Sequence, residues 1–207
     1  TKFIDLYQIH RWDYETPIKE TLIALDQLVK DKKVGHIGGS NMWTWQLAKS
    51  LWICNDLDLE RFETIQTHYN LCYREEEREM IPFCEDQNIS ILPYNPVAKG
   101  FLSGKYNRNT KNESIRFKTD PGLAAKFFKP EDFDVLDMVI QIANEKDVKP
   151  AQIAIAWLLT KTITSPIIGV TKKSHVEEAV DALDIKLTND DIKRLEEPYQ
   201  VHSIHHL

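Results

Sequence analysis

The chain has 207 residues, of which 42% are hydrophobic and 28% are charged, and its formal net charge is −6. This length suffices for one domain with a sizeable core or for two small domains. The acidic balance argues against broad binding to nucleic acids or anionic membranes, and no apolar run is long enough to span a bilayer. Cys54, Cys72 and Cys84 have no CxxC spacing, so we interpret them as buried reduced thiols of a cytoplasmic protein.

Five short apolar stretches are each followed by polar side chains. They are too short for free-standing helices and rich in Ile, Val and Leu, so we predict that they are buried strands. Ligands of parallel α/β folds bind at the C-terminal ends of strands, so we expect the polar residues to converge on one site, with His10 nearest the chemistry. The stretches are residues 5–10, which end at His10, 34–39 before Ser40 and Asn41, 62–65 before Gln66, 89–92 before Tyr94 and Asn95, and 165–169 before Val170 and Thr171.

Helices are expected between these strands. Thr16 and Pro17 predict a helix start, in which a hydroxyl cap precedes proline at the first helical position. The charged run 74–78 is interpreted as the solvated start of another helix, because acidic residues in a first turn favour the helix dipole. This helix is expected to bury Met80, Ile81 and Cys84. The helix after Asn41 is expected to bury an apolar side made of Trp45, Leu47, Ala48, Leu51 and Trp52.

The second half of the chain is predicted to contain further helices over 131–146 and 150–160, after a long polar loop at 106–130. Two capping boxes, Ser174 with Glu177 and Thr188 with Asp191, each predict the start of another helix. The tail is expected to be irregular. Its three histidines are interpreted as incidental or artificially added, with metal binding as the alternative; they are His202, His205 and His206.

The alternation of strands and helices predicts a parallel sheet with right-handed crossovers. The chain lacks the GxGxxG and GxxxxGK[ST] motifs of the usual phosphate cradles, and it lacks HExxH and GxSxG. A parallel strand opens the chain almost at once, from which we expect that an upstream part is missing.

With these strand ends in order, the sequence resembles the aldo-keto reductase family, and within it the aryl-alcohol dehydrogenase-like branch. The likeness covers nearly the whole chain, and its motifs are specific together although most are weak singly. The matching stretches are residues 5–10, 38–41, 66–71, 93–96, 100–106, 151–159 and 166–171, and those typical of the branch are 69–80 and 195–199.

The resemblance implies a (β/α)8 TIM barrel, of which this chain would hold about strands 4 to 8 and the C-terminal helices as one partial domain over residues 1–207. It also implies hydride transfer between NADP(H) and a small-molecule carbonyl or alcohol. His10 matches the family's active-site histidine, which would orient the substrate carbonyl and donate a hydrogen bond to the developing oxyanion. Without the other motifs, a histidine hydrogen-bonded in the core would be an equal alternative.

Cofactor-binding residues are likewise implied by the resemblance, with strand capping and core packing as their structural alternatives. Ser40 and Asn41 match the pair that holds the nicotinamide carboxamide, Gln66 lies beside them, and Tyr94 matches the aromatic residue that stacks on the nicotinamide ring. The loop around the pyrophosphate is matched by Asn95, Pro96, Val97, Gly100, Leu102 and Lys105. The segment around the adenosine 2′-phosphate and the adenine is matched by Gly169, Val170, Thr171, Lys172, Lys173, His175 and Glu178.

The chain departs from the family pattern at several points. His175 stands where the family usually has Arg or Gln, and Ala179 where it usually has Asn. The family's catalytic Asp, Tyr and Lys find no match, since Tyr7 and Tyr14 flank His10 without fitting the pattern. A barrel without its first strands has open edges. We therefore expect the chain to be marginally stable or to self-associate through those edges.

The sequence supports an aldo-keto reductase-type oxidoreductase that interconverts an aldehyde or ketone and an alcohol. The alternatives are a catalytically incomplete relative that binds a nucleotide or a partner, and a gene remnant. The substrate cannot be read from the residues, although Trp12, Trp43 and Tyr69 weakly favour an aromatic or apolar carbonyl.

Overall fold

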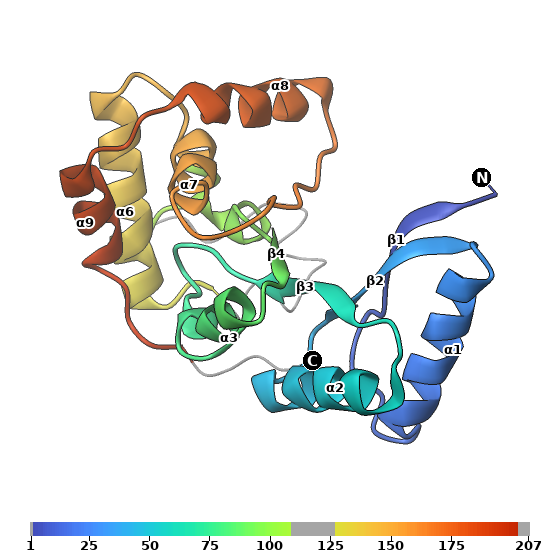
Figure 1. Ribbon diagram of the computed structural model, residues 1–207. Helices are drawn as coiled ribbons and strands as arrows, with labels where there is room; N and C mark the ends of the chain where they lie inside the picture. The colour runs from blue at the N-terminus through green and yellow to red at the C-terminus, as the bar shows by residue number, and fades with distance from the viewer. Residues whose placement is uncertain (1, 109–126, 203–207) are drawn as a thin grey trace. The chain divides into compact units, whose positions relative to one another are not determined.

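The computed structural model describes residues 2–108 and 127–202, and its strands form one parallel sheet (Figure 1). The strand order is β1-β2-β3-β4, which confirms the first four predicted strands. Much of the expected polar loop at 106–130, together with His205 and His206, lies outside the described residues. The strands are β1 (Ile4–Gln8), β2 (Val34–Ser40), β3 (Phe62–His68) and β4 (Ser90–Tyr94).

The fifth predicted strand, at 165–169, is reduced to an isolated bridge. Ile167 pairs in parallel with Tyr94, and its backbone N–H donates to the carbonyl oxygen of Pro93 at 2.7 Å. Proline has no backbone N–H and cannot extend a ladder. Because Pro93 and Pro166 lie next to the bridged residues, the pairing ends after one rung.

The described contacts divide the chain into two compact units. The first unit takes in residues 1–68 and 76–92, and the second takes in residues 69–75 and 93–205. The expectation of a single partial domain over 1–207 stays a prediction, and each unit is described by itself.

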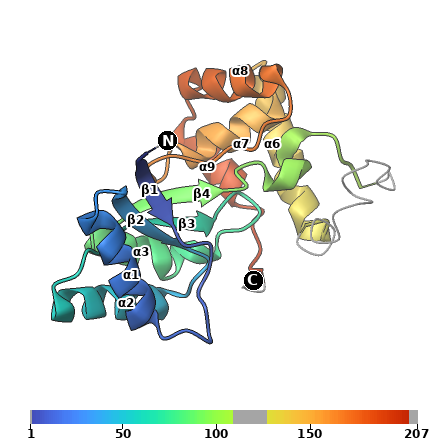
Figure 2. The ribbon, with the colours of Figure 1, turned by 90° about the vertical axis from the view of Figure 1, so that its right-hand side faces the viewer.

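In the first unit, α1 (Ile18–Lys30) and α2 (Thr44–Leu57) lie on the same side of the strands, and α3 (Met80–Asp86) precedes β4 (Figure 2). The core is apolar, as parallel sheets require. The burial expected of Met80, Ile81 and Cys84 on α3 is confirmed. Fully buried core side chains include Leu22, Ile37, Leu47, Phe62 and Ile65.

Two expectations about these helices are wrong. Pro17, not Thr16, is the N-cap of α1, and the Thr16 hydroxyl instead donates to Asp13 at 2.7 Å. Trp45 and Trp52 of α2 are 57% and 67% exposed, while α2 buries the face with Leu47, Ile53 and Cys54.

Two polar residues of α2 explain why that face can be buried. The Ser50 hydroxyl donates to the Gln46 carbonyl at 2.9 Å, and the Gln46 side chain accepts from the Trp43 N–H at 2.8 Å. A buried polar group costs little when it is hydrogen-bonded. Polar residues satisfied within the helix can therefore face inward while two tryptophans face out.

The second unit is mainly helical, with α6 (Pro130–Glu145) between α7 (Pro150–Leu158) and α9 (Asn189–Glu196), and α8 (Lys173–Asp181) against α7 (Figure 1). Short 3-10 turns are η2 (Ala98–Ser103) and η3 (Ala182–Asp184), and η1 (Glu75–Glu77) begins where the first segment of this unit ends. Trp157 is the largest fully buried side chain of the chain's described part.

The two predicted capping boxes differ in outcome. Thr188 caps α9, since its hydroxyl accepts from the Asp191 N–H at 3.1 Å and the Asp191 carboxylate accepts from the Thr188 N–H at 2.8 Å. That prediction is confirmed. The box at Ser174 is wrong, because α8 starts at Lys173 and Ser174 lies inside its first turn.

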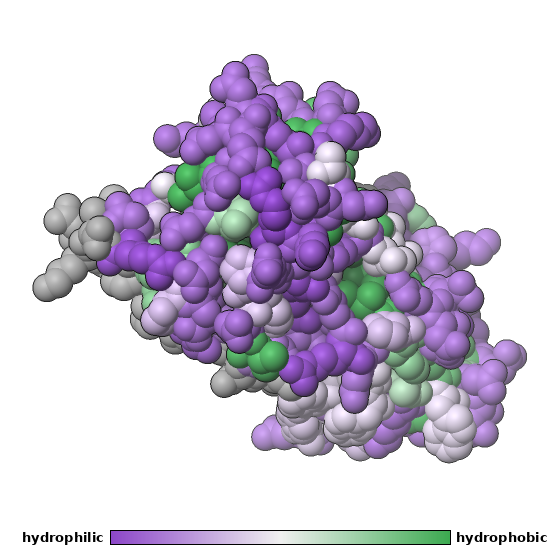
Figure 3. Space-filling model, turned by 90° about the vertical axis from the view of Figure 1, so that its left-hand side faces the viewer, coloured by the Kyte–Doolittle hydropathy of each residue, from purple (hydrophilic) through white to green (hydrophobic). Residues whose placement is uncertain are grey.

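The surface of the face shown in Figure 3 is mainly hydrophilic, with apolar residues in small separate patches. Scattered surface apolar residues of this kind are usual for globular proteins. Within residues 2–108 and 127–202, no helix combines the length and the apolar character needed to cross a membrane.

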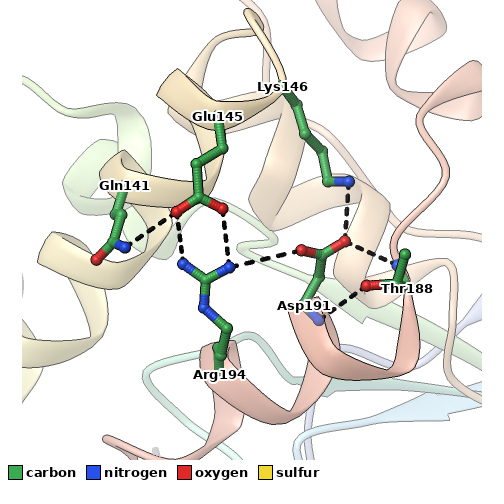
Figure 4. Close-up of polar contacts among 6 residues, drawn as sticks. All are labelled: Gln141, Glu145, Lys146, Thr188, Asp191 and Arg194. Carbon is green, nitrogen blue, oxygen red and sulfur yellow. Dashed lines mark hydrogen bonds and ion pairs between the residues drawn. The ribbon is translucent and has the colours of Figure 1, made fainter.

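A network of ion pairs joins α6 to α9 (Figure 4). Arg194 binds both carboxylate oxygens of Glu145, at 2.8 and 2.6 Å, and this contact lowers the pKa of Glu145 to about 2. Lys146 pairs with Asp191 at 2.8 Å. Burial by itself would raise the pKa of Asp191, but the hydrogen bonds from Lys146 and Thr188 outweigh it and leave that pKa below its ordinary value.

We predict that Asp191 makes the chain acid-sensitive. An acid with a lowered pKa contributes stability that is present above its ordinary pKa, and this contribution is lost as the pH falls below about 4. Asp191→Asn should therefore lose less stability than the parent chain between pH 6 and pH 3, as measured by urea unfolding at both values. Asp190→Asn, on the exposed neighbouring residue, is the control. If the free energy of unfolding fell equally in the parent chain and in Asp191→Asn between pH 6 and pH 3, the prediction would be contradicted.

Candidate functional site

Four of the expected site residues lie at the C-terminal ends of β1, β2 and β3 in the first unit. The Asn41 side-chain amide donates to the His10 carbonyl oxygen at 2.9 Å, and the Ser40 hydroxyl donates to the Gln66 carbonyl oxygen at 3.0 Å. Ser40 is buried, Asn41 and Gln66 are half-buried, and His10 is exposed. Side chains of β2 and the residue after it therefore tie the ends of three adjacent strands together.

The backbone of β2 brings these ends into line. Gly38 lies opposite Thr64 and Ser40 lies opposite Gln66, after a register shift between Ile37 and Gly38. Such irregularities re-aim the side chains that follow. A Cβ added at Gly38 would come within 2.1 Å of the Thr64 hydroxyl oxygen, so glycine permits the close approach of β2 to β3.

Two asparagines turn the chain sharply at strand ends. Asn41 directly follows β2 with φ 47°, and Asn95 directly follows β4 with φ 58°. Asparagine tolerates this left-handed conformation better than most residues other than glycine. Both therefore redirect the backbone at the strand end where a parallel α/β fold binds its ligand.

The loop after Asn95, in the second unit, contains an unusual run of left-handed residues: Ala98, Lys99 and Gly100 have φ of 47°, 56° and 92°. Such a conformation costs about 1–2 kcal/mol for each non-glycine residue, and it persists only where the surrounding structure imposes it. The Gly100 N–H donates to the Val97 carbonyl at 2.8 Å, which closes the turn. A Cβ at Gly100 would meet no atom within 4 Å, so the backbone is open on that side.

Other expected residues of this loop differ in exposure. Pro96 and Leu102 are buried, so both also serve the core of the second unit. Tyr94, Asn95 and Val97 are half-buried, and Lys105 is exposed. The structure thus keeps the loop open at Gly100 and exposes its terminal lysine, while most of its apolar side chains are buried.

The expected phosphate segment is exposed throughout, from Gly169 to Lys173, and it leads into the N-terminus of α8. The first turn of α8 contains no acidic residue, and a helix N-terminus favours anions. Lys173 lies 3.3 Å from Glu177, in a pair whose side chains are 91% and 59% exposed. Such a pair is weak and would compete little for a phosphate.

Glu178 and His175 lie elsewhere on α8. The Glu178 carboxylate pairs with Lys149 at 2.5 Å, and the Glu178 carbonyl accepts from the Gln152 side chain at 3.1 Å. The carboxylate is thus engaged by the start of α7 rather than open. His175 is half-buried in the first turn of α8, where its N–H donates to the Lys172 carbonyl at 3.1 Å.

The expected residues therefore form two sets. His10, Ser40, Asn41 and Gln66 are brought together in the first unit, whereas Tyr94 and the residues after it belong to the second. That both sets form one site stays a prediction.

The charged run at 74–78 is not the solvated helix start that the sequence indicated. The Arg74 side chain is 13% exposed, and its guanidinium lies 5.7 Å from the Trp157 ring and 5.2 Å from the Tyr199 ring. Its Nη2 pairs with Glu196 at 3.2 Å. Glu75 is buried and accepts from Tyr199 and His202. Arg74 and Glu75 are thus part of the second unit's interior, whereas residues 76–78 belong to the first unit, where Glu76 and Glu77 are half-buried and Arg78 is exposed.

Sequence reasoning also missed Asn70. It is fully buried, and its side-chain amide donates to the carbonyl oxygen of Asn95 at 3.0 Å. Asn70 lies in the stretch 66–71 that resembles the family, but no spacing rule points from it to Asn95. The remaining tail prediction is wrong for His202, which is buried rather than incidental.

The three cysteines are buried, as expected. Burial raises the pKa of Cys54 to about 11 and of Cys84 to about 12, and it raises the pKa of Cys72 well above its ordinary value. Thiols with a raised pKa are poor nucleophiles and poor metal ligands. Within the described residues, no group of three or more His, Cys, Asp or Glu side chains could hold a metal ion.

Comparison with known proteins decides the family. The model of the aldo/keto reductase family matches residues 1–200. The chain belongs to the aldo/keto reductase family. The fold of this family is a (β/α)8 barrel, and the parallel sheet with its helices is part of one. The sequence-based recognition and fold class are thereby confirmed.

Several curated relatives of this aldo/keto reductase chain are fungal proteins. It is 38% identical over 98% of its length to a versiconal hemiacetal acetate reductase of Aspergillus parasiticus, covering 59% of that protein. It is 39% identical over 96% of its length to a Saccharomyces cerevisiae protein that carries the name of an aryl-alcohol dehydrogenase, covering 57% of it. An aldo-keto reductase of Fusarium vanettenii is 36% identical, with 53% covered. The chain thus spans little more than half the length of these relatives.

We predict that the two glycines before Ser40 respond differently to alanine. Gly38→Ala would press a methyl group against the Thr64 hydroxyl and its backbone carbonyl, at 2.1 and 3.0 Å. We expect a loss of about 1–3 kcal/mol in the free energy of unfolding, measured with urea. Gly39→Ala is the matched control, because its methyl group would crowd the flexible end of Met42 and meet Ile65 at an ordinary contact distance of 3.6 Å. Equal losses in both variants would contradict the proposed close approach at Gly38.

Proposed function

We propose that the chain carries the NADP(H)-binding part of an aldo-keto reductase-type oxidoreductase that interconverts an aldehyde or ketone and an alcohol. The observation that carries this proposal is the family match over residues 1–200, which includes every expected site residue. The names of the relatives, which include reductases and an aryl-alcohol dehydrogenase, support the same class of reaction. A cytoplasmic setting is proposed with it, supported by three buried thiols.

At the nicotinamide end, Ser40, Asn41 and Gln66 would hold the carboxamide, with Tyr94 against the ring. The hydrogen bonds among the strand ends support this role, since they fix polar groups before any ligand binds. The Ser40 hydroxyl donates to Gln66, so its oxygen retains acceptor capacity for a carboxamide N–H.

At the phosphate end, the loop from Asn95 to Lys105 would wrap the pyrophosphate, and Lys172 and Lys173 would bind the 2′-phosphate. The open backbone at Gly100 and Gly169 leaves room for a ligand, since a Cβ at either would meet no atom within 4 Å. Two exposed lysines at a helix N-terminus fit a dianionic phosphate, which favours NADP(H) over NAD(H).

The chemistry that NADP(H) supplies when bound is hydride transfer to or from the substrate carbon. His10 is exposed at the end of β1, where its imidazole would donate a hydrogen bond to the carbonyl oxygen and stabilise the charge that develops there. The Asn41 contact to its carbonyl fixes the backbone that carries this ring. The family's Asp, Tyr and Lys are not matched here, and losing a positioned proton donor costs about 10²–10⁴-fold in rate.

The substrate class is proposed to be aromatic or apolar. Trp12, two residues after His10, lies with its ring 5.9 Å from that of Trp45 in the same unit. Indole rings offer large apolar faces to an aromatic carbonyl.

The test is a titration of the 207-residue chain with NADPH, followed by intrinsic fluorescence, and then turnover assays with aromatic aldehydes. Saturable quenching with turnover supports the proposal. Quenching without turnover favours a catalytically incomplete relative. A folded chain that shows neither would overturn the proposal.

We predict that the double variant Lys172→Ala/Lys173→Ala binds NADPH at least about tenfold more weakly, because each charge-assisted contact to phosphate contributes about 1.5–3 kcal/mol. NADH, which lacks the 2′-phosphate, should bind the variant and the parent chain alike. Lys186→Ala, on another exposed lysine of the second unit, is the control. If the variant lost affinity for NADPH and for NADH to the same extent, the two lysines would not contact the 2′-phosphate.

We further propose that the chain self-associates through β1. This strand is an edge of the sheet, and Phe3, Ile4 and Tyr7 are 43%, 41% and 41% exposed, although parallel strands are usually covered on both faces. Tyr7→Lys should lower the average mass measured by light scattering at high concentration. Ile23→Lys, on an exposed apolar residue of α1, should leave that mass unchanged. A parent chain that is monomeric at every concentration would refute the proposal.

A further inference from the structure

We propose that the C-terminal segment 199–202 positions the loop from Asn95 to Lys105, with His202 and Tyr199 as positioning residues. The importance of this loop for nucleotide binding rests on the function proposed above. The geometry that links the segment to the loop lies within the second unit and does not depend on that function. The link has two arms, one through α6 and one through the turn at 70–75.

The first arm begins with the buried imidazole of His202. Its Nε2 lies 2.8 Å from Oδ1 of Asp132, and its Nδ1 lies 3.4 Å from Nζ of Lys129. An ammonium group can only donate, so Nδ1 is the acceptor and Nε2 carries the hydrogen that Asp132 accepts. The other oxygen of Asp132 accepts from the Lys129 N–H at 2.9 Å. His202 is therefore fastened to the first turn of α6.

From α6, the contact continues through aromatic rings. Phe133, next to Asp132, meets Phe101 edge-on with ring centroids 5.2 Å apart. Phe101 lies in η2, in the middle of the loop, and is fully buried. An aromatic pair in this arrangement contributes beyond its buried area. The start of α6 thus supports the loop from one side.

The second arm runs through Glu75. Its carboxylate accepts from the Tyr199 hydroxyl at 2.5 Å and from the His202 N–H at 3.0 Å. The Tyr199 oxygen in turn accepts from the Arg74 N–H at 3.2 Å. Hydrogen bonds to a buried carboxylate are strong, and leaving such a charge with fewer partners is costly.

From Glu75, the chain turns back to Asn70. Asn70 and Tyr73 exchange two backbone hydrogen bonds, at 3.1 and 3.0 Å, and the Asn70 side-chain oxygen accepts from the Cys72 N–H at 2.9 Å. The Asn70 amide then donates to the Asn95 carbonyl at 3.0 Å. The tight turn therefore supports the first residue of the loop from the other side.

The loop needs such support because of its backbone. Ala98 and Lys99 are held in the left-handed region, which non-glycine residues leave unless their surroundings prevent it. The segment 199–202 contacts both supports, through Asp132 and through Glu75. Removing the contacts of segment 199–202 should therefore increase local opening of the loop, while the rest of the second unit stays folded.

The test compares His202→Ala with the parent chain by amide hydrogen exchange of residues 97–103, at matched global stability. We expect exchange in this loop to become at least about tenfold faster, equivalent to about 1.4 kcal/mol of local stability. His202→Gln, which can still donate to Asp132, should restore part of the protection. Tyr199→Phe keeps the ring beside Arg74 but loses the hydroxyl, so it tests the second arm should His202→Ala fail to fold.

Arg194→Ala is the control, because it breaks the α6–α9 contacts and touches neither arm. Loop exchange that responds equally to Arg194→Ala and to the segment variants would overturn the proposal. An NADPH titration of the same variants distinguishes the positioning role of the segment from the proposed function of the loop. Weaker binding together with faster loop exchange supports both the positioning role and the proposed function. Faster exchange in a chain that binds no NADPH supports the positioning role alone and counts against the proposed function.

Discussion

The partly buried ion pair between Arg74 and Glu196 is a contact on which much of the second unit depends. Glu196 accepts from the Trp157 indole at 2.9 Å and from Lys161 at 2.5 Å, and Arg74 lies against the rings of Trp157 and Tyr199. Burial alone would raise the pKa of Glu196, yet its partners hold that pKa below the ordinary value. The carboxylate is therefore charged, and removing a partner would leave a partly buried charge unpaired, which costs more than the pair contributes.

The contacts of Arg74 and Glu196 also explain why the short segment 69–75 belongs to a different unit from the residues on either side of it. Residues 69–75 follow β3 directly, and residues 76–92 return to the first unit, yet 69–75 itself belongs to the second. Arg74, Glu75 and Asn70 each find their partners there, on α7, on the C-terminal segment and on the loop after β4. The charges of Arg74 and Glu75, which would ordinarily face water, are thus satisfied by Glu196, Tyr199 and His202, each more than a hundred residues away in the sequence.

That distance marks the limit of what the sequence could predict. Short apolar runs located β2 and its neighbours, and the local spacing of Thr188 and Asp191 identified the start of α9, because each signal lies within a few residues. Glu75, His202 and Asn70 carry no such signal, since their roles depend on long-range contacts. Trp45 and Trp52 were mispredicted for a different reason. Their apolar character indicated burial, but Ser50 and Gln46 are buried in their place, because the Ser50 hydroxyl donates to the Gln46 carbonyl and the Gln46 side chain accepts from the Trp43 N–H.

For the candidate site, too, the sequence predicted some features and could not predict others. The residue types at strand ends and the family motifs named His10, Ser40, Asn41 and Gln66, and the structure ties these strand ends together by hydrogen bonds. The sequence could not show that Glu178 is engaged by Lys149, or that a left-handed run shapes the loop after Asn95. Both depend on backbone geometry and on partners from other helices, which residue identity alone does not specify.

The three buried thiols have a practical consequence for following how the chain opens. Cys54 and Cys84 lie in the first unit and Cys72 in the second, with exposed fractions of 2%, 0% and 0%. A thiol reagent can reach them only when their surroundings open, so the labelling rate of each cysteine measures the opening of its own unit. The native chain therefore carries built-in reporters that tell independent opening of the two units from cooperative unfolding.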